Sequence, residues 1–157
     1  MDMPKPGAEH QALSIFAGTW KGVDTMPPSP WSPQMSTADG HIINKPALGG
    51  FSVLQDYVQT QGGETRYEGH GVFTWEAEAR EYVMYWFDSM GSPVNVFRGN
   101  VSGSTWTFIS KEPRGLTRSV WVFSGAGAYR HTMEVSPDGN AWSTFMSGEY
   151  TKVTLSR

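Results

Sequence analysis

The stretch EYVMYWFDSMGSPVNVFRGNVSGSTWTFIS, residues 81–110, decides the fold class. It contains runs of β-branched and aromatic residues at 81–87 and 105–110, separated by glycine-containing turns at 91–93 and 102–104. β-branched and aromatic side chains favour strands, and glycine accommodates the tight turns between neighbouring antiparallel strands. This part of the chain therefore predicts consecutive β-hairpins.

Similar turn signals recur on both sides of this stretch, about a dozen residues apart. They lie at 49–50, 62–63, 76–80, 113–115, 125–127 and 137–140, and strand-like runs include 18–26, 37–46 and 51–60. Short, regular connections of this kind are typical of meandering antiparallel sheets, which close to remove their edges. The sequence predicts an all-β fold, a single antiparallel up-and-down β-barrel of about ten strands with a short N-terminal helix.

The chain is predicted to be one domain over residues 1–157. Residues 1–16 form an N-terminal segment with a short helix at 9–16, whose apolar side is Ala12, Leu13, Ile15 and Phe16. Residues 17–157 form the barrel. The proline-rich segment 27–33 is expected to be a loop between the first two strands, because proline supplies no ladder donor.

The composition argues against several classes of function. The chain has 157 residues, a formal net charge of −3 and no cysteine. It has no basic cluster for nucleic-acid phosphates, and no thiol for disulfides, catalysis or metal binding. Hydrolase and phosphate-loop motifs are absent from the sequence. No secretion signal or membrane span is found, so we expect a cytoplasmic protein.

Two runs, 82–87 and 120–123, are apolar on both strand faces. A lone barrel has one face in water, so this pattern predicts that something covers the outside. The N-terminal helix and a second subunit, giving a homodimer, are the two alternatives.

Several segments carry a family resemblance. Ala-Gly-Thr-Trp-Lys-Gly at 17–22 resembles the Gly-x-Trp opening of calycin barrels, the superfamily of lipocalins, fatty-acid-binding proteins and nitrobindins. Pro-Lys-Pro-Gly with Glu-His at 4–10, Ala-Leu-Gly-Gly-Phe at 47–51, Gly-His-Gly-Val-Phe at 69–73 and Tyr-Trp-Phe-Asp-Ser-Met-Gly at 85–91 resemble DUF1579, a bacterial family of unknown function. The resemblance implies a lipocalin-like barrel and supplies no activity.

The resemblance also bears on Trp20 and on haem. In calycins such a tryptophan packs across the closed end of the barrel, where Lys152 or Arg157 would be its basic partner. Nitrobindins carry their iron-ligating histidine on the last strand, but this chain has Phe-Met-Ser-Gly-Glu at 145–149. Only His131, one strand earlier, could replace it. No cofactor is predicted, and haem is disfavoured.

The predicted ligand site combines an apolar wall with a polar end. The wall residues are Phe51, Tyr57, Trp86, Trp121, Met133 and Phe145. His131 and either Arg98 or Arg118 would fix the polar end of the ligand. Aromatic walls with few inward polar groups are typical of small-molecule pockets.

His131 and His70 are the two histidines inside strand patterns. Alternation places His131 on one face with Tyr129, Met133 and Val135, an expected interior row. There it could bind a ligand carboxylate, coordinate haem, act as a base or be a hydrogen-bonded core residue. His70 shares its face with an acidic residue, so it either binds ligand or faces solvent.

Asp88 shares a face with Trp86 and Met84. If it is buried it needs a partner, and Arg98 and Arg118 are the candidates. An unpaired inward arginine would suit an anionic head group. The alternative is a structural role for Asp88, as one side of an ion pair or as the cap of its turn.

Three functions remain open from the sequence. The first is a carrier or sensor that binds a small apolar or amphipathic molecule inside the barrel. The second is an isomerase or cyclase in the same cavity, with His131 or Asp88 as acid–base catalyst. The third is an interaction or homodimer module whose interior is filled.

Overall fold

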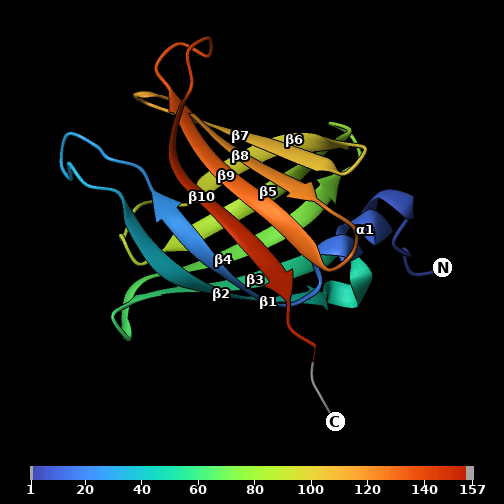
Figure 1. The fold of residues 1–157 in the computed structure, drawn as a ribbon. Coiled ribbons are helices and arrows are strands. Elements are labelled where there is room, and N and C mark those ends of the chain that lie inside the picture. Colours follow the sequence, from blue (N-terminus) through green and yellow to red (C-terminus); the bar gives the residue numbers. More distant parts are fainter. Residues whose placement is uncertain (1, 155–157) are drawn as a thin grey trace.

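The computed structural model describes residues 2–154, which form a closed barrel of ten antiparallel strands with short helices at one end (Figure 1). The helical elements are α1 (Ala8–Ala12), η1 (Leu13–Phe16) and η2 (Leu48–Gly50). The strands are β1 (Gly18–Met26), β2 (Ser36–Ala47), β3 (Ser52–Gln61), β4 (Glu64–Glu76), β5 (Glu81–Asp88), β6 (Asn95–Ser102), β7 (Thr105–Glu112), β8 (Gly115–Phe123), β9 (Ala128–Ser136) and β10 (Ser143–Lys152). The predicted all-β barrel is confirmed.

Each strand pairs with its sequence neighbours, and β1 closes the barrel against β10. The predicted turn signals fall in or at the edges of the connections, because glycine permits the positive φ angles of these tight turns. Gly62 and Gly63, between β3 and β4, have φ angles of 62° and 82°. Several strand boundaries differ from the expected ones by one or two residues. The difference that bears on the site is at Phe51, which was expected in the third strand but lies in the turn after η2, with φ −79° and ψ −19°.

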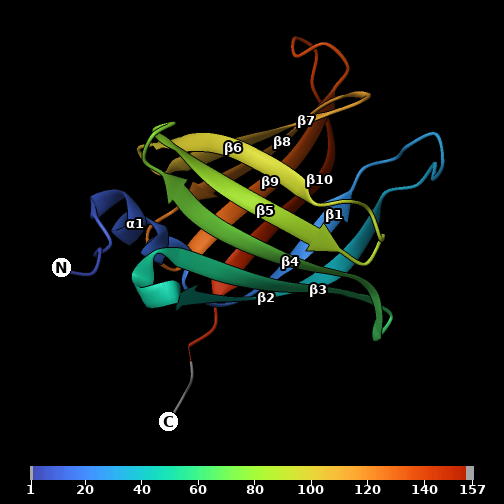
Figure 2. The same cartoon turned by 180° about the vertical axis from the view of Figure 1, so that it is seen from behind.

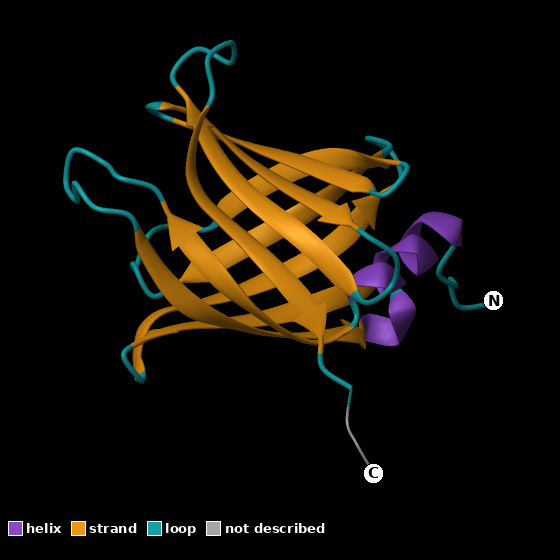
Figure 3. Ribbon diagram, viewed as in Figure 1, coloured by secondary structure: helices purple, strands orange, loops and turns teal. Residues whose placement is uncertain are grey.

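The two ends of the barrel differ (Figures 2 and 3). The closed end carries α1, η1, η2 and the short turns at 77–80, 103–104 and 124–127. The open end carries the connections at 27–35, 62–63, 89–94, 113–114 and 137–142. Figure 3 shows the helices gathered at one end, away from the longest loops. Among residues 2–154, no helix is long and apolar enough to cross a membrane.

The predicted helix at 9–16 plugs the closed end. It begins as α1 and tightens into the 3₁₀ turn η1, which ends where Ala17 adopts an extended conformation. Phe16 enters the barrel, where its ring stacks on Phe73 with 4.7 Å between centroids. It also meets the rings of Trp106, Trp121 and Phe123 at 5.0, 5.6 and 5.2 Å. The closed half is therefore filled by aromatic packing.

Trp20 seals the same end, as the calycin resemblance implied. It is fully buried, and its indole N–H donates to the Phe16 carbonyl over 2.9 Å. The Lys152 Nζ lies 5.6 Å from its ring centroid, a cation–π contact. Lys152 is thus the basic partner, and the alternative, Arg157, lies outside the described residues.

The two runs that are apolar on both faces were expected to be covered on the outside, but Phe87 and Val122 are 50% and 42% exposed there, and only the part of β5 around Val83 is covered. Val83 faces outward between Tyr82 and Met84, yet it is fully buried. Arg98 of β6 reaches across β5 to Glu76 of β4, with nitrogen–oxygen distances of 2.6 and 3.3 Å. The aliphatic part of this side chain therefore lies over the row that contains Val83. The N-terminal helix, by contrast, packs at the barrel end.

Candidate functional site

The barrel holds a cavity of about 450 Å³ that opens at the end opposite η1. Its lining comes from strand segments near that end, including Met26 of β1, Asp88 of β5, Glu112 of β7 and Met146 of β10. Most of the lining surface is apolar. A space of this size with few polar groups matches the usual dimensions of a small-molecule site.

Trp121 forms the floor of the cavity. Its ring contacts Phe16 below and stacks on the His131 imidazole above, with 4.3 Å between ring centroids and an angle of 14°. The Ser119 hydroxyl lies 2.7 Å from the His131 Nε2. The predicted interior row is confirmed here, because His131, Met133 and Val135 all line the cavity.

His131 is held in its neutral form. Burial inside the barrel lowers the pKa of this imidazole to about 3, because the charged form loses its hydration there. At neutral pH His131 therefore presents an uncharged, hydrogen-bonding ring to the cavity.

A buried carboxylate lies behind one wall. Asp24 of β1 is fully buried and accepts hydrogen bonds from the hydroxyls of Tyr150, over 2.6 Å, and Tyr57. The Gln59 amide donates to the same carboxylate over 3.0 Å. Burial, followed by the nearby Asp24 charge, raises the pKa of both phenols well above the ordinary value. The tyrosines are therefore protonated donors, and Asp24 makes no ion pair within residues 2–154.

Glycines make room for this cluster. A Cβ atom on Gly40 would lie 2.0 Å from the Tyr150 hydroxyl, and one on Gly148 would lie 2.3 Å from an Asp24 carboxylate oxygen. Gly22 meets the Tyr150 ring in the same way, at 2.7 Å. The inward positions of three neighbouring strands are thus kept free of side chains so that Tyr150 can reach Asp24.

A second polar cluster lies nearer the mouth. The Tyr67 hydroxyl donates to the Asp88 carboxylate over 2.8 Å, and the Trp86 indole N–H lies 3.0 Å from that hydroxyl and 3.2 Å from the carboxylate. Burial raises the pKa of Tyr67, as does its hydrogen bond to Asp88. Asp88 also caps its turn by accepting from the Met90 N–H. Its partners are therefore neutral donors, and neither Arg98 nor Arg118 pairs with it.

Trp86 lies across the inner surface of β4. A Cβ atom on Gly69 would be 2.0 Å from its Cζ2 atom, and one on Gly71 would be 3.1 Å from its Cε3 atom. Two glycines at alternate positions of β4 thus let the indole lie against the barrel wall. Gln55 lies beside this ring, since a Gly71 Cβ would also touch its Cβ at 3.6 Å.

Gln55 has unmet hydrogen-bonding capacity. The residue is 4% exposed and lines the cavity, and its Nε2 is buried without a partner among residues 2–154. Buried amide groups are almost always paired, so such a group needs an explanation. A molecule in the cavity would supply the partner that the protein does not.

The structure brings together seven of the eleven predicted site residues. The residues that line the cavity are Tyr57, Trp86, Asp88, Trp121, His131, Met133 and Phe145. The other four lie elsewhere: Phe51, His70, Arg98 and Arg118. Their positions follow from the strand register, because inward and outward residues alternate.

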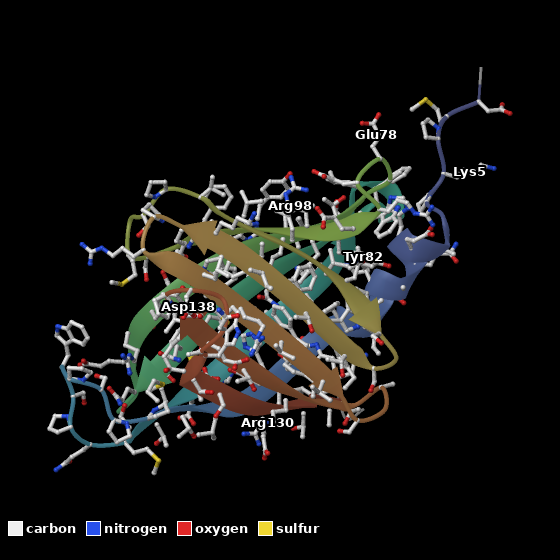
Figure 4. The ribbon with its side chains drawn as sticks, turned by 90° about the horizontal axis from the view of Figure 1, so that it is seen from above. Lys5, Glu78, Tyr82, Arg98, Arg130 and Asp138 are labelled. Atoms are coloured by element: carbon white, nitrogen blue, oxygen red, sulfur yellow. The ribbon has the colours of Figure 1, made fainter. Side chains whose placement is uncertain are left out.

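Each of these four has another partner. Phe51 packs edge-on against His10 at the closed end, 4.9 Å between ring centroids. His70 pairs on the outside with Asp56 over 2.8 Å. Arg98 bridges acidic residues over β5, and Figure 4 shows it on the outer edge of the barrel.

Arg118 likewise points outward. Its guanidinium donates to both oxygens of Glu134 at 3.0 and 2.9 Å. It also lies over the Trp142 ring, 3.9 Å from the centroid. Both arginines that could have received an anionic head group are therefore outside the cavity.

The sequence interpretation missed the polar half of the cavity wall. The overlooked residues are Asp24, Gln55, Gln59, Tyr67 and Tyr150. Strict alternation from Trp20 would have found Asp24, since Trp20, Gly22 and Asp24 share one face of β1. An acidic residue in an interior row is the signal, because an unsupported buried charge is expensive.

Comparisons with known proteins support the fold. The family model described as "Protein of unknown function (DUF1579)" matches residues 5–152. No curated protein matches the chain. Among solved structures, Rv2717c from M. tuberculosis is similar with a TM-score of 0.67 and 12% identity, covering 94% of this chain and 99% of that one. The S-type phycobiliprotein lyase CPES from Guillardia theta has a TM-score of 0.61 and 9% identity, covering 96% and 94%.

Proposed function

The chain belongs to the DUF1579 family of proteins of unknown function, and from its barrel we propose that it binds one small apolar or amphipathic molecule in the open-ended cavity. The observation that carries the proposal is the cavity itself, about 450 Å³ with a mostly apolar lining and a few converging polar groups. Such a combination of volume and lining is expected of a ligand site.

Two features of the open half do not contribute to stability. Glycines leave room for the side chains of Trp86 and Tyr150, and the Gln55 amide nitrogen has no hydrogen-bond partner within residues 2–154. A domain whose interior served only as core would gain free energy by filling this space, since voids and unpaired amides are both destabilising. This argument favours a carrier or sensor over an interaction module with a filled interior. A homodimer remains a separate prediction, checked by native mass.

An acid–base enzyme in the same cavity is the alternative. The name of the phycobiliprotein lyase supports it only by analogy, because a shared fold does not carry function. His131 is a poor general base at neutral pH, because burial lowers its pKa to about 3 and efficient bases have a pKa near the working pH. The environment of His131 therefore favours binding over catalysis.

The cavity does not fit haem held as in nitrobindins. The only cavity-lining histidine among residues 2–154 is His131. Its Nε2 is already engaged with Ser119, and its ring is stacked on Trp121. We expect titration with haemin to give no sharpened Soret band, and a sharpened band that His131→Ala abolishes would contradict this expectation.

Native mass spectrometry of protein purified without added ligand tests the proposal. We expect an adduct that denaturation releases, or saturable binding of small apolar probes in calorimetry. Met133→Trp, which points into the cavity, should abolish the binding. The matched control Thr132→Trp adds the same ring to the outward face of β9 and should preserve it. Equal binding by both variants would place the probe on the surface and overturn the proposal.

A further inference from the structure

We propose that the ligand is an amphipathic organic cation, an amine or quaternary ammonium with an apolar body, held by Asp88 and the rings of Tyr57, Tyr67 and Trp86. This inference rests on the proposed function and specifies the chemistry of the ligand. It follows from the charges inside the barrel, the aromatic rings beside them and the position of the arginines.

Among the cavity-lining residues the acidic side chains, Asp88 and Glu112, outnumber the basic one, Arg66. Asp24 is fully buried behind the wall, and Asp88 is half-buried in it. At the mouth the exposed Arg66 and Glu112 carry opposite charges and offset each other. The described residues that line the cavity include no other lysine or arginine. A low-dielectric wall strengthens the field of these carboxylates, so the cavity attracts positive charge.

The ion pairs of the protein explain why this charge is not cancelled. All five ion pairs among residues 2–154 lie outside the cavity, including those of Arg98 and Arg118. The two acidic residues of the interior are satisfied only by neutral donors, two tyrosine hydroxyls and an amide at Asp24 and a phenol and an indole at Asp88. Hydrogen bonds of this kind stabilise a carboxylate without removing its negative charge. An anionic ligand would face repulsion, whereas a cation would complete the pair.

Three aromatic rings that contact one another form one continuous part of the wall where the cationic group is expected to lie. The Tyr57 ring centroid lies 5.8 Å from that of Tyr67 and 6.4 Å from that of Trp86. All three rings line the cavity: Tyr67 and Trp86 donate to Asp88, Tyr57 donates to Asp24, and the indole lies against the glycines of β4. Electron-rich rings close to a carboxylate are a favourable environment for ammonium groups. The thioethers and rings deeper in the cavity, such as Met84, would hold the apolar body.

Gln55 is an independent indication that this space receives a ligand. Its buried Nε2 has no partner among residues 2–154, and it lies on the wall next to Trp86. The unpaired amide is thus within the same part of the cavity as the acidic and aromatic groups. Because this Nε2 is a donor, its partner would be an acceptor oxygen of the ligand, such as a hydroxyl or carbonyl oxygen, carried in addition to the cationic group.

Isothermal titration calorimetry with three probes of equal chain length tests the proposal. The probes are octyltrimethylammonium, n-octanol and octanoate. We expect the cation to bind roughly ten-fold more tightly than the alcohol, and octanoate to bind most weakly. Equal binding of all three would overturn the cation proposal and leave the proposed function standing. Tighter binding of octanoate would also overturn it, and saturation by none of the probes would overturn both.

Single substitutions test which side chains bind the cationic group. Asp88→Asn keeps the shape of the side chain and should reduce binding of octyltrimethylammonium roughly ten-fold while sparing n-octanol. Asp56→Asn is the matched control, because it removes one carboxylate from the outer face and should change neither affinity. Trp86→Phe is a second variant should Asp88→Asn fold poorly, and it should weaken the cation more than the alcohol. Equal losses for the two probes would overturn the assignment of these residues.

Discussion

The two halves of the barrel use the same strands for different purposes. On β7 the inward residues run from Trp106 and Phe108 at the closed end to Ser110 and Glu112 at the open end. On β8 they change in the same direction, from Phe123 and Trp121 to Ser119 and Thr117, and on β4 from Phe73 to Gly71 and Gly69. The cavity exists because small and polar side chains replace aromatic ones at these inward positions of β4, β7 and β8. Aromatic packing is thus concentrated in one half, and the proposed ligand site lies in the other.

The largest effect should come from truncating the ring at the centre of the closed half. Phe16 is 1% exposed and contacts four other aromatic rings. Phe16→Ala should lower the free energy of unfolding by about 3–5 kcal/mol, measured by urea denaturation. Trp86→Ala in the open half should cost only about 1–2 kcal/mol, because its ring faces a cavity. Similar losses in both variants would contradict the division into a structural and a binding half.

A smaller effect tests the contact between the Trp86 ring and the two glycines of β4, Gly69 and Gly71. Gly69→Ala places a methyl group 2.0 Å from the indole, so the ring must move, whereas the same change at Gly71 leaves 3.1 Å. We expect Gly69→Ala to destabilise the protein by about 1–3 kcal/mol and to shift tryptophan emission. Gly71→Ala should cost less than about 1 kcal/mol. Should Gly71→Ala prove the more damaging variant, the arrangement of Trp86 over β4 would be wrong.

The pH dependence of the free energy of unfolding tests whether His131, at the floor of the cavity, is buried. Folding lowers the pKa of His131 from 6.5 to about 3, so the unfolded chain binds more protons between these values. The contribution of this group is complete above pH 6.5 and is lost as the pH falls toward 3. On acidification from pH 7 to pH 5, the loss of this contribution should lower the free energy of unfolding by about 1–2 kcal/mol.

His131→Gln isolates this contribution, because glutamine does not titrate. Urea denaturation of the wild type and the variant at the two pH values gives the comparison. The variant should lose less stability on acidification than the wild type. If both lose the same amount, His131 is hydrated in the folded protein and the cavity floor is more polar than its packing indicates.

The fold was predictable because its signals are local. Each turn has its own glycines, and each strand its own β-branched and aromatic residues, so the meander could be read without knowledge of distant contacts. The N-terminal plug was equally visible, since residues 9–16 place Leu13 and Phe16 on one side. The start of the third strand was predicted one residue too early, at Phe51, and the strand begins at Ser52.

The site was predictable only in part, because it depends on which strand face points inward. His131 and Met133 were placed in the cavity because alternation put them in one row with apolar and aromatic neighbours, whereas Trp86 lies in a run that is apolar on both faces and was a candidate by its residue type. Arg98 and Arg118 were candidate ligands by charge alone, and the register turns both outward. Asp24 was missed because the alternation from Trp20 was not followed along the first strand, although it places this acidic residue in an interior row. Its partners come from β3 and β10, far away in the sequence.

The smallest expected effect tests that register directly. His70 was a predicted site residue, but it lies on the outer face of β4, one position from Gly69, where it pairs with an exposed Asp56. An exposed pair contributes little, so His70→Ala should change the free energy of unfolding by less than about 0.5 kcal/mol. Its affinity for octyltrimethylammonium should equal that of the wild type, whereas Gly69→Ala should weaken it. Because a slip of one residue exchanges the two faces of a strand, the opposite pattern would place His70, and not Gly69, on the inner face of β4. Substitutions at two adjacent residues thus decide which face of β4 points into the barrel.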